Sequence, residues 1–332
     1  MKERLLQYLV CPACQQELRL TVEKKEGLEI TEGLLTCPQC ATVYPIAGGI
    51  PSFVQEVSED KQKTAAAFGY EWTHFTEMPE TYEAQFLDWI SPIQPDFFKG
   101  KVVLDAGCGI GRHTYYAAQY GAKDVIGVDL SQAVETSYKQ VGLAFENAHI
   151  VQADIYALPF RPGTFDFGYS IGVLHHLPDP QAGFSAVVRS IKAGGAVFGW
   201  VYGHENNGIV HYFIDPLRKS ITRYLPHNFL NGISFFLTVI LQIILKGVYR
   251  PLNAIGIKSL PSNEYLMHIS HFNFRTNYSI VFDHLVAPTA FYIRREDFET
   301  WFTTLHLKDI KLSWRNQNSW RGYGVIPTEQ KS

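Results

Sequence analysis

Four of the five cysteines in this 332-residue chain form two Cys-Pro-x-Cys turns, at residues 11–14 and 37–40. Each turn can offer two thiolates from one tight knuckle, and two such knuckles can enclose one tetrahedral metal ion. The spacing therefore predicts a structural zinc site with the ligands Cys11, Cys14, Cys37 and Cys40. Iron also suits four thiolates, and four reduced cysteines without a metal are a further alternative.

A glycine-rich turn, VVLDAGCGIGRHT at residues 102–114, follows an apolar run. In an open parallel sheet, ligands bind at the carboxyl ends of the strands, and the first strand-to-helix turn is the usual cradle. Gly107 and Gly109 allow the backbone to approach a ligand closely. A dinucleotide fingerprint would need a glycine at the position of Arg112. The turn therefore favours a ligand that brings no phosphate to this position.

Three aspartates near this turn offer the acceptors that a cationic nucleoside requires. Asp105 precedes the glycines, where it can meet a cationic amine. Asp129 ends the run VIGVD and can accept hydrogen bonds from both ribose hydroxyls. Asp154 ends the run VQAD and can reach an adenine amino group. An amine, a ribose and an adenine together describe S-adenosylmethionine.

Short apolar runs alternate with helical segments from residue 101 to about residue 203. This alternation predicts right-handed βαβ units and a parallel sheet with helices on both faces, an α/β fold. The pattern resumes near residue 294, so the residues between are an insertion after the fifth strand. The expected parts are a zinc ribbon at 1–54, a linker with cofactor-lid helices at 55–100, and the main domain at 101–332, with the insertion at about 203–293.

Four ordered stretches resemble the class I S-adenosylmethionine-dependent methyltransferases, and most nearly the group with the ubiquinone, menaquinone and sugar O-methyltransferases. They are VVLDAGCGIGRHT, VIGVDLS, VQADIYALPFRPGTFDFGYSIGVLHHLPDP and SIKAGGAVF. The resemblance implies a Rossmann-like sheet of seven strands whose last two strands pair antiparallel. It also implies that Asp105, Gly107 and Gly109 contact the methionine part of the cofactor, Asp129 the ribose, and Asp154 with Ile155 the adenine, and that Ser170 lies near the sulfonium. Ala106, Cys108 and Leu130 are further expected cofactor contacts.

An aromatic segment, FGYEWTHF at residues 68–75, precedes this core. Methyltransferases of this group fold a helix over the cofactor at the corresponding place. The resemblance makes Tyr70 a cofactor contact and Trp72 and His74 further parts of that lid. Aromatic packing without a ligand is the alternative.

Two adjacent histidines follow the predicted fourth strand, in GVLHHLPDP. Methyl transfer is an in-line displacement that depends on alignment, and a hydroxyl acceptor must also lose its proton. Similar histidines act as the base in sugar O-methyltransferases, so His175 and His176 are the catalytic candidates, unless they only shape the loop. Further pocket candidates are Tyr202, His204, Glu205, Asp283 and His284.

The segment LLTCPQCATVYPIAGGIPSFV resembles the small zinc-ribbon proteins that activate tRNA, rRNA and protein methyltransferases. Residues 1–60 carry five basic and nine acidic residues, a balance that does not suit phosphate binding. We therefore expect the ribbon to stabilise the enzyme or to shape its substrate site.

The most apolar stretch of the chain, residues 229–249, lies in the insertion. Its apolar part is too short and too interrupted for a confident transmembrane helix, so it is either a buried cap helix or an interfacial one. Its polar residues form one narrow helical stripe: Asn231, Ser234, Thr238 and Gln242. Residues 215–258 carry six basic residues and one acid, Asp215, a balance that an anionic membrane surface attracts.

The net charge of −3 argues against a whole-chain affinity for nucleic acid, and the segment MKERLLQYLV lacks the apolar core of a secretory signal. We expect a cytoplasmic methyltransferase, in contact with the inner face of the membrane if the apolar helix is interfacial. The expected reaction is O-methylation of a small-molecule, sugar or lipid-linked acceptor, with S-adenosylmethionine as cofactor and structural zinc. The alternatives are an RNA or protein methyltransferase with a fused activator ribbon, and a cofactor-binding scaffold without catalysis.

Overall fold

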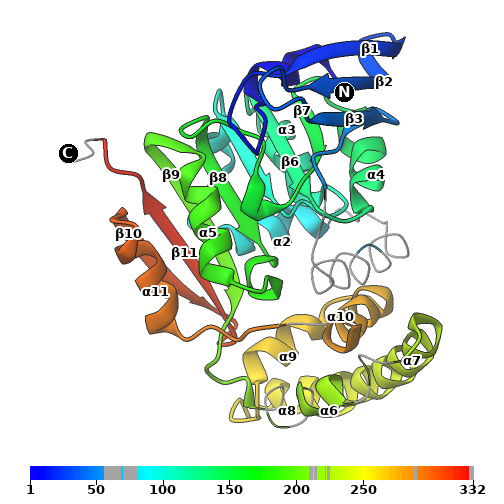
Figure 1. The fold of residues 1–332 in the computed structure, drawn as a ribbon. Coiled ribbons are helices and arrows are strands. Elements are labelled where there is room, and N and C mark those ends of the chain that lie inside the picture. Colours follow the sequence, from blue (N-terminus) through cyan, green and yellow to red (C-terminus); the bar gives the residue numbers. More distant parts are fainter. Residues whose placement is uncertain are drawn as a thin grey trace.

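The computed structural model describes residues 1–55, 69, 81–208, 212, 215–220, 222, 225–286 and 290–328. Figure 1 shows three parts in one row: the N-terminal strands at one end, the main sheet in the middle, and a layer of helices at the opposite end. Tyr70, Trp72 and His74 lie outside the described residues, so the predicted lid contact of Tyr70 stays a prediction.

The N-terminal part is a small antiparallel sheet that follows a short 3-10 helix, η1 (Glu3–Tyr8). Its strands are β1 (Arg19–Glu26), β2 (Glu29–Thr36), β3 (Val43–Ala47) and β4 (Ile50–Pro51), paired in that order. Buried side chains of this part, such as Leu5 and Leu9, belong to the same hydrophobic cluster as Phe160 and Phe165 of the main domain. The two parts therefore share one core.

Polar contacts reinforce this shared core. The Asp124 carboxylate of the main domain is buried. It accepts hydrogen bonds from Tyr8 Oη at 2.6 Å and His149 Nε2 at 3.1 Å, and it forms an ion pair with Arg4 Nη2 at 2.7 Å. The backbone also pairs, because Val10 N–H donates to Pro159 O at 2.9 Å and Phe53 N–H donates to Gln152 O at 2.8 Å.

The main sheet has seven strands in the order β10-β11-β9-β8-β5-β6-β7. Strands β9, β8, β5, β6 and β7 are parallel, and β11 pairs antiparallel with both β9 and β10. The predicted class I methyltransferase topology is confirmed. The strands are β5 (Val102–Ala106), β6 (Asp124–Asp129), β7 (Ala148–Gln152), β8 (Phe165–Ile171), β9 (Ile191–Tyr202), β10 (Lys308–Arg315) and β11 (Ser319–Val325).

Side chains of β5 alternate between two hydrophobic clusters, as a strand with two covered faces requires. Val102, Leu104 and Ala106 join the cluster beneath α5 (Pro180–Arg189) and α11 (Arg295–Thr304), whereas Val103 joins the cluster beneath α2 (Thr81–Trp89) and α3 (Arg112–Gln119). Further short helices are η2 (Pro95–Phe98), α4 (Ala133–Ser137), η3 (Tyr138–Gly142), η4 (Ile155–Ala157) and η5 (Leu174–His176).

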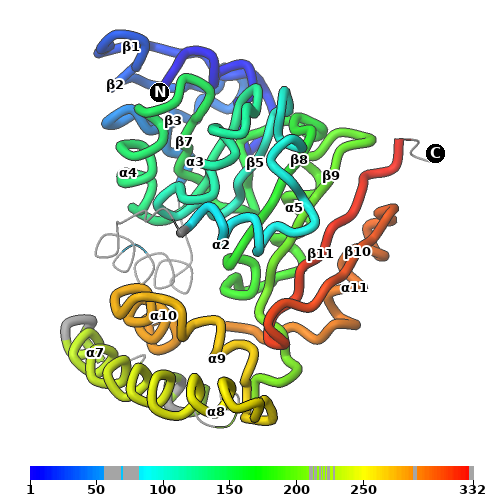
Figure 2. The backbone as a smooth tube through the Cα atoms, turned by 180° about the vertical axis from the view of Figure 1, so that it is seen from behind, coloured from blue at the N-terminus to red at the C-terminus, as the bar shows by residue number. Residues whose placement is uncertain are grey.

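The insertion begins after Tyr202, the last residue of β9, and therefore lies beyond the carboxyl ends of the parallel strands. Figures 1 and 2 show it as a helical layer opposite the N-terminal part, with α7 and α8 outermost. Its helices are α6 (Asp215–Ser220), α7 (His227–Ile244), the π-helical turn η8 (Leu245–Tyr249), α8 (Arg250–Ala254), α9 (Asn263–Ser270) and α10 (Phe274–Val286).

Candidate active site

The glycine turn between β5 and α3 has a backbone that only glycine adopts without strain. Gly107 has a φ of 88° and Gly111 a φ of 86°, both in the left-handed region. A Cβ atom on Gly107 would lie 2.3 Å from Val173 Cγ2. The N–H groups of Gly107 and Cys108 both donate to Val128 O, at 2.7 and 2.9 Å, which fixes the turn against β6.

Two of the predicted aspartates lie at the carboxyl edge of the sheet. Asp129 Oδ2 accepts from Gly109 N at 2.9 Å, and its Oδ1 accepts from Ser131 N and Oγ at 2.8 and 2.7 Å. Asp154 Oδ1 accepts from Tyr156 N at 3.0 Å. These bonds hold both carboxylates in fixed positions at the ends of neighbouring strands.

Asp105 is placed differently, because its side chain points under the turn rather than out of it. The residue is fully buried, and its Oδ2 accepts from Thr114 Oγ1 at 2.7 Å, whereas Oδ1 has no hydrogen-bond partner among the described residues. Burial raises the pKa of the Asp105 carboxyl from 3.8 to about 7, and the nearby Asp129 adds to that rise.

A cavity of about 290 Å³ opens between the glycine turn and the insertion. No described residue of the N-terminal part lines it, so the prediction that the ribbon shapes the substrate site gains no support from this geometry. Asp105, Ala106 and Ser170 do not line it either, and their predicted cofactor contacts stay predictions. The predicted residues that line it are Gly107, Cys108, Gly109, Asp129, Leu130, Asp154, Ile155, His176, Tyr202, Asp283 and His284.

The two catalytic candidates in η5 point in different directions. His176 lines the cavity. His175 is fully buried behind it, 4.0 Å from Tyr202 between ring centroids, and neither of its ring nitrogens has a hydrogen-bond partner in the part of the chain described. Burial holds the pKa of His175 well below its usual range, so its imidazole is neutral near pH 7. Of the two, only His176 has a path to a ligand in this cavity.

The pocket candidates after β9 also divide into two groups. Tyr202 Oη donates to Asp283 Oδ2 at 3.0 Å, and both side chains line the cavity. Glu205 instead accepts from Arg295 N at 2.9 Å and from Trp320 Nε1 at 3.0 Å, which makes it a brace between α11 and β11. His204 is exposed and lies outside the cavity lining.

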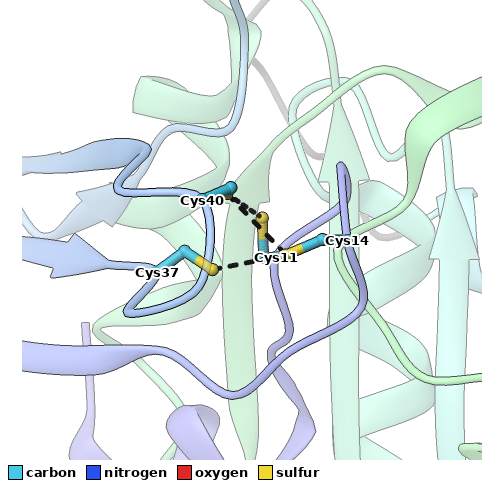
Figure 3. A group of neighbouring side chains, drawn as sticks. All are labelled: Cys11, Cys14, Cys37 and Cys40. Carbon is cyan, nitrogen blue, oxygen red and sulfur yellow. Dashed lines mark hydrogen bonds between the residues drawn. The ribbon is translucent and has the colours of Figure 1, made fainter.

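The four predicted zinc ligands converge where two loops of the N-terminal part meet (Figure 3). All four Sγ atoms lie within 4.8 Å of one another, and the closest pairs are 3.4 to 3.7 Å apart. Tetrahedral Zn–S bonds of about 2.3 Å place sulfurs about 3.8 Å apart, so the cluster fits zinc. Both knuckles are built alike, since Gln15 and Ala41 have φ values of 60° and 58°. Four thiolates leave no open position, which indicates a structural site.

A family model described as "Methyltransferase domain" matches residues 104–199, and one described as "Trm112p-like protein" matches residues 2–49. Residues 104–199 are a methyltransferase domain. The resemblance to methyltransferases and to methyltransferase-activator zinc ribbons is confirmed, each for its own part of the chain.

The relatives of the methyltransferase domain carry names with different acceptors. A ubiquinone biosynthesis O-methyltransferase from Ralstonia nicotianae is 34% identical over 34% of this chain and 47% of its own length. A tRNA U34 carboxymethyltransferase from Alteromonas mediterranea is 34% identical over 29% of this chain and 31% of its own length. A solved complex of the Haloferax volcanii Trm112 activator with a putative methyltransferase is 14% identical over 82% of this chain and 100% of that chain, with a TM-score of 0.44. The chain spans 25% to 63% of the length of the curated relatives it matches.

S-adenosylmethionine is the methyl donor of such domains, and the cavity fits it. Gly107 and Gly109 line the cavity, and the carboxylates of Asp129 and Asp154 offer hydrogen-bond acceptors along the same cavity. Ile155, which lines the cavity and is largely buried, offers an apolar surface for a base.

The far wall of the cavity contains a polar cluster that the sequence analysis missed. Arg315, only 6% exposed, lines the cavity and donates from Nε to Asp88 Oδ2 at 2.7 Å. Its Nη2 lies 3.1 Å from His268 Nε2 on α9, and Tyr265 of the same helix also lines the cavity. The available signal in the sequence was weak, because it was a single arginine in the run LSWRN.

Proposed function

We propose that the protein transfers a methyl group from S-adenosylmethionine to a hydroxyl group of an acceptor held in this cavity. The observation that carries the proposal is the position of His176: its side chain lines the same cavity as the glycine turn and as Tyr202 and Asp283 of the far side.

The bound cofactor would supply an electrophilic methyl group. The chain's own residues then have three tasks. Asp129 and Asp154 would hold the nucleoside part of the cofactor, and the aromatic side chains that line the cavity would exclude water. His176 would accept the proton of the acceptor hydroxyl as its oxygen attacks.

The acceptor side of the cavity is mainly apolar, with polar groups at a few points. Ile269 of α9, Ile280 of α10 and Phe272 in the turn between these helices provide apolar surface. Asn207 and Asn318 add polar groups. This combination suits a small molecule with an apolar body and few polar substituents, a description that includes lipid-linked acceptors. Four reduced thiolates also suit a cytoplasmic site of action.

The test is a tritiated methyl-donor assay on extracted metabolite, lipid and RNA fractions. We expect label in a metabolite or lipid fraction, and the His176→Ala variant to lose about 10²- to 10⁴-fold in kcat at nearly unchanged cofactor affinity. His204→Ala is the matched control, because its imidazole is exposed and outside the cavity.

Three outcomes would contradict the proposal. Label that enters RNA would favour an RNA methyltransferase with a fused activator ribbon. Tight cofactor binding without transfer to any fraction would favour a scaffold. Full activity of His176→Ala on an accepted substrate would remove His176 as the base.

A further inference from the structure

Helix α7 has the reverse of the usual polarity of a surface helix. The residues that it buries are largely polar, since Ser234 and Thr238 are 0% exposed and Gln242 is 8% exposed. Its outward side is apolar and includes Phe236 at 65% and Ile243 at 65% exposure. A surface helix in water normally shows polar residues outward and apolar residues inward.

Packing against α10 fixes this orientation of α7. Leu230 of α7 packs with Phe282 and Val286 of α10 in one small hydrophobic cluster. Tyr278 Oη on α10 lies 3.2 Å from both Asn231 O and Asn231 Oδ1. The outward side of α7 is therefore one that a partner can reach without separating the two helices.

The apolar surface continues beyond α7. Val248 of η8 is 42% exposed, and Ile255 and Ile257, which follow α8, are 72% and 43% exposed. We define the outer face as the exposed apolar residues of this region other than Phe235, which packs against Phe274 and Tyr278 of α10: Phe229, Phe236, Leu237, Ile240, Ile243, Ile244, Val248, Ile255 and Ile257. Figures 1 and 2 agree that α7 and α8 lie at the side of the molecule farthest from the N-terminal strands. An exposed apolar surface of this extent indicates an interaction site.

The charges around the outer face have one sign. Residues 216–263 contain no aspartate and no glutamate. Lys246 and Lys258 lie on this stretch and are exposed. An apolar surface whose own stretch of chain carries basic and no acidic residues is complementary to anionic lipid headgroups above acyl chains.

We propose that the outer face docks on an anionic lipid bilayer, with α7 lying parallel to the membrane plane. The segment Phe229–Ala254 is long and apolar enough to cross a membrane by length and composition alone, which is weak evidence by itself. A lying helix fits the contacts better, because a crossing helix would lose α10 and would place Ser234, Thr238 and Gln242 in hydrocarbon. Docking does not depend on the proposed methyl transfer.

Vesicle flotation of the full chain tests the proposal. We expect the protein to float with phosphatidylcholine vesicles that contain one fifth phosphatidylglycerol, and at least about tenfold less with phosphatidylcholine alone. The double variant Phe236→Glu/Ile243→Glu should bind anionic vesicles at least about tenfold more weakly than the wild type. Leu28→Glu/Leu143→Glu is the matched control, because these leucines are 66% and 57% exposed away from the outer face. Its binding should equal that of the wild type.

Thermal unfolding and cofactor titration of each variant are the controls that test whether the fold is retained. Failure of the wild type to float, or equal flotation of all variants, would overturn the proposal. A wild-type dimer in light scattering that Phe236→Glu/Ile243→Glu dissociates, without vesicle binding, would assign the outer face to a second copy of this chain. Because flotation needs no acceptor, its failure is distinguishable from failure of methyl transfer.

Discussion

The buried carboxylate of Asp124 offers a quantitative test of how the zinc ribbon is joined to the methyltransferase domain. Its side chain is 0% exposed, accepts a hydrogen bond from Tyr8 and forms an ion pair with Arg4, both of the ribbon. Removing one member of a buried ion pair costs about 3–5 kcal/mol. Asp124→Asn keeps one acceptor oxygen, and Arg4 is 46% exposed and can be hydrated. We therefore expect the free energy of unfolding to fall by about 2–3 kcal/mol.

Urea unfolding at pH 7, followed by tryptophan fluorescence and circular dichroism, measures this loss. Glu17→Gln is the matched control, since Glu17 and Arg161 pair across the same interface but are 82% and 53% exposed. That change should cost less than about 0.5 kcal/mol. If Asp124→Asn is no more destabilising than Glu17→Gln, the buried pair does not hold the two parts together.

The pH dependence of the same variant gives a second measurement. Burial alone would raise the pKa of Asp124, but hydrogen bonds from His149 and Tyr8 and the charge of Arg4 outweigh it and hold the pKa below its usual range. Such a group stabilises the fold above the unfolded-state pKa of about 3.9, and this stabilisation disappears as the pH falls through the lower folded-state pKa. The difference between wild type and Asp124→Asn should therefore shrink under strongly acidic conditions.

Three further expectations concern the turn, the buried acid and the metal. Gly107→Ala should weaken cofactor binding in calorimetry by at least about tenfold, because its Cβ would meet Val173, whereas Gly100→Ala, with a similar positive φ but open space, should not. Burial raises the pKa of Asp105 to about 7, so the folded chain holds an extra proton between about pH 4 and pH 7. The free energy of unfolding should thus fall as the pH rises through that window, and urea titrations of Asp105→Asn should lack this part of the slope. Mass spectrometry of metals should find one zinc per chain in wild type and in Cys108→Ser, and none in Cys37→Ser.

The local features of this fold could be predicted from the sequence. The parallel strands of the main sheet are short apolar runs bounded by turn residues, and their order follows from motifs that resemble a known family. The zinc site was also predictable, since four cysteines in two knuckles have few other uses. These signals lie within a few residues of one another.

Features that depend on contacts between distant segments could not be predicted. The sequence places His175 and His176 side by side, and only the tertiary structure shows that His176 lines the cavity and His175 does not. The polar stripe of α7 was visible in the sequence, but whether it faces inward or outward depends on the packing of α7 against α10. Arg315 is held in the polar cluster of the cavity by its hydrogen bond to Asp88, which lies 227 residues earlier in the chain.

The bond between Phe53 and Gln152 has a consequence for the solubility of the protein. Strand β7 is an edge of the main sheet, its sequence AHIVQ carries no lysine and no acid, and Phe53 occupies part of its backbone. Uncovered edge strands are templates for aggregation, which proteins usually prevent with charges. The strand at the opposite edge of the sheet, β10, carries such protective charges on Lys308, Asp309 and Lys311. At β7 the zinc ribbon takes the place of charges, so loss of the metal would leave this edge open to pairing with other chains.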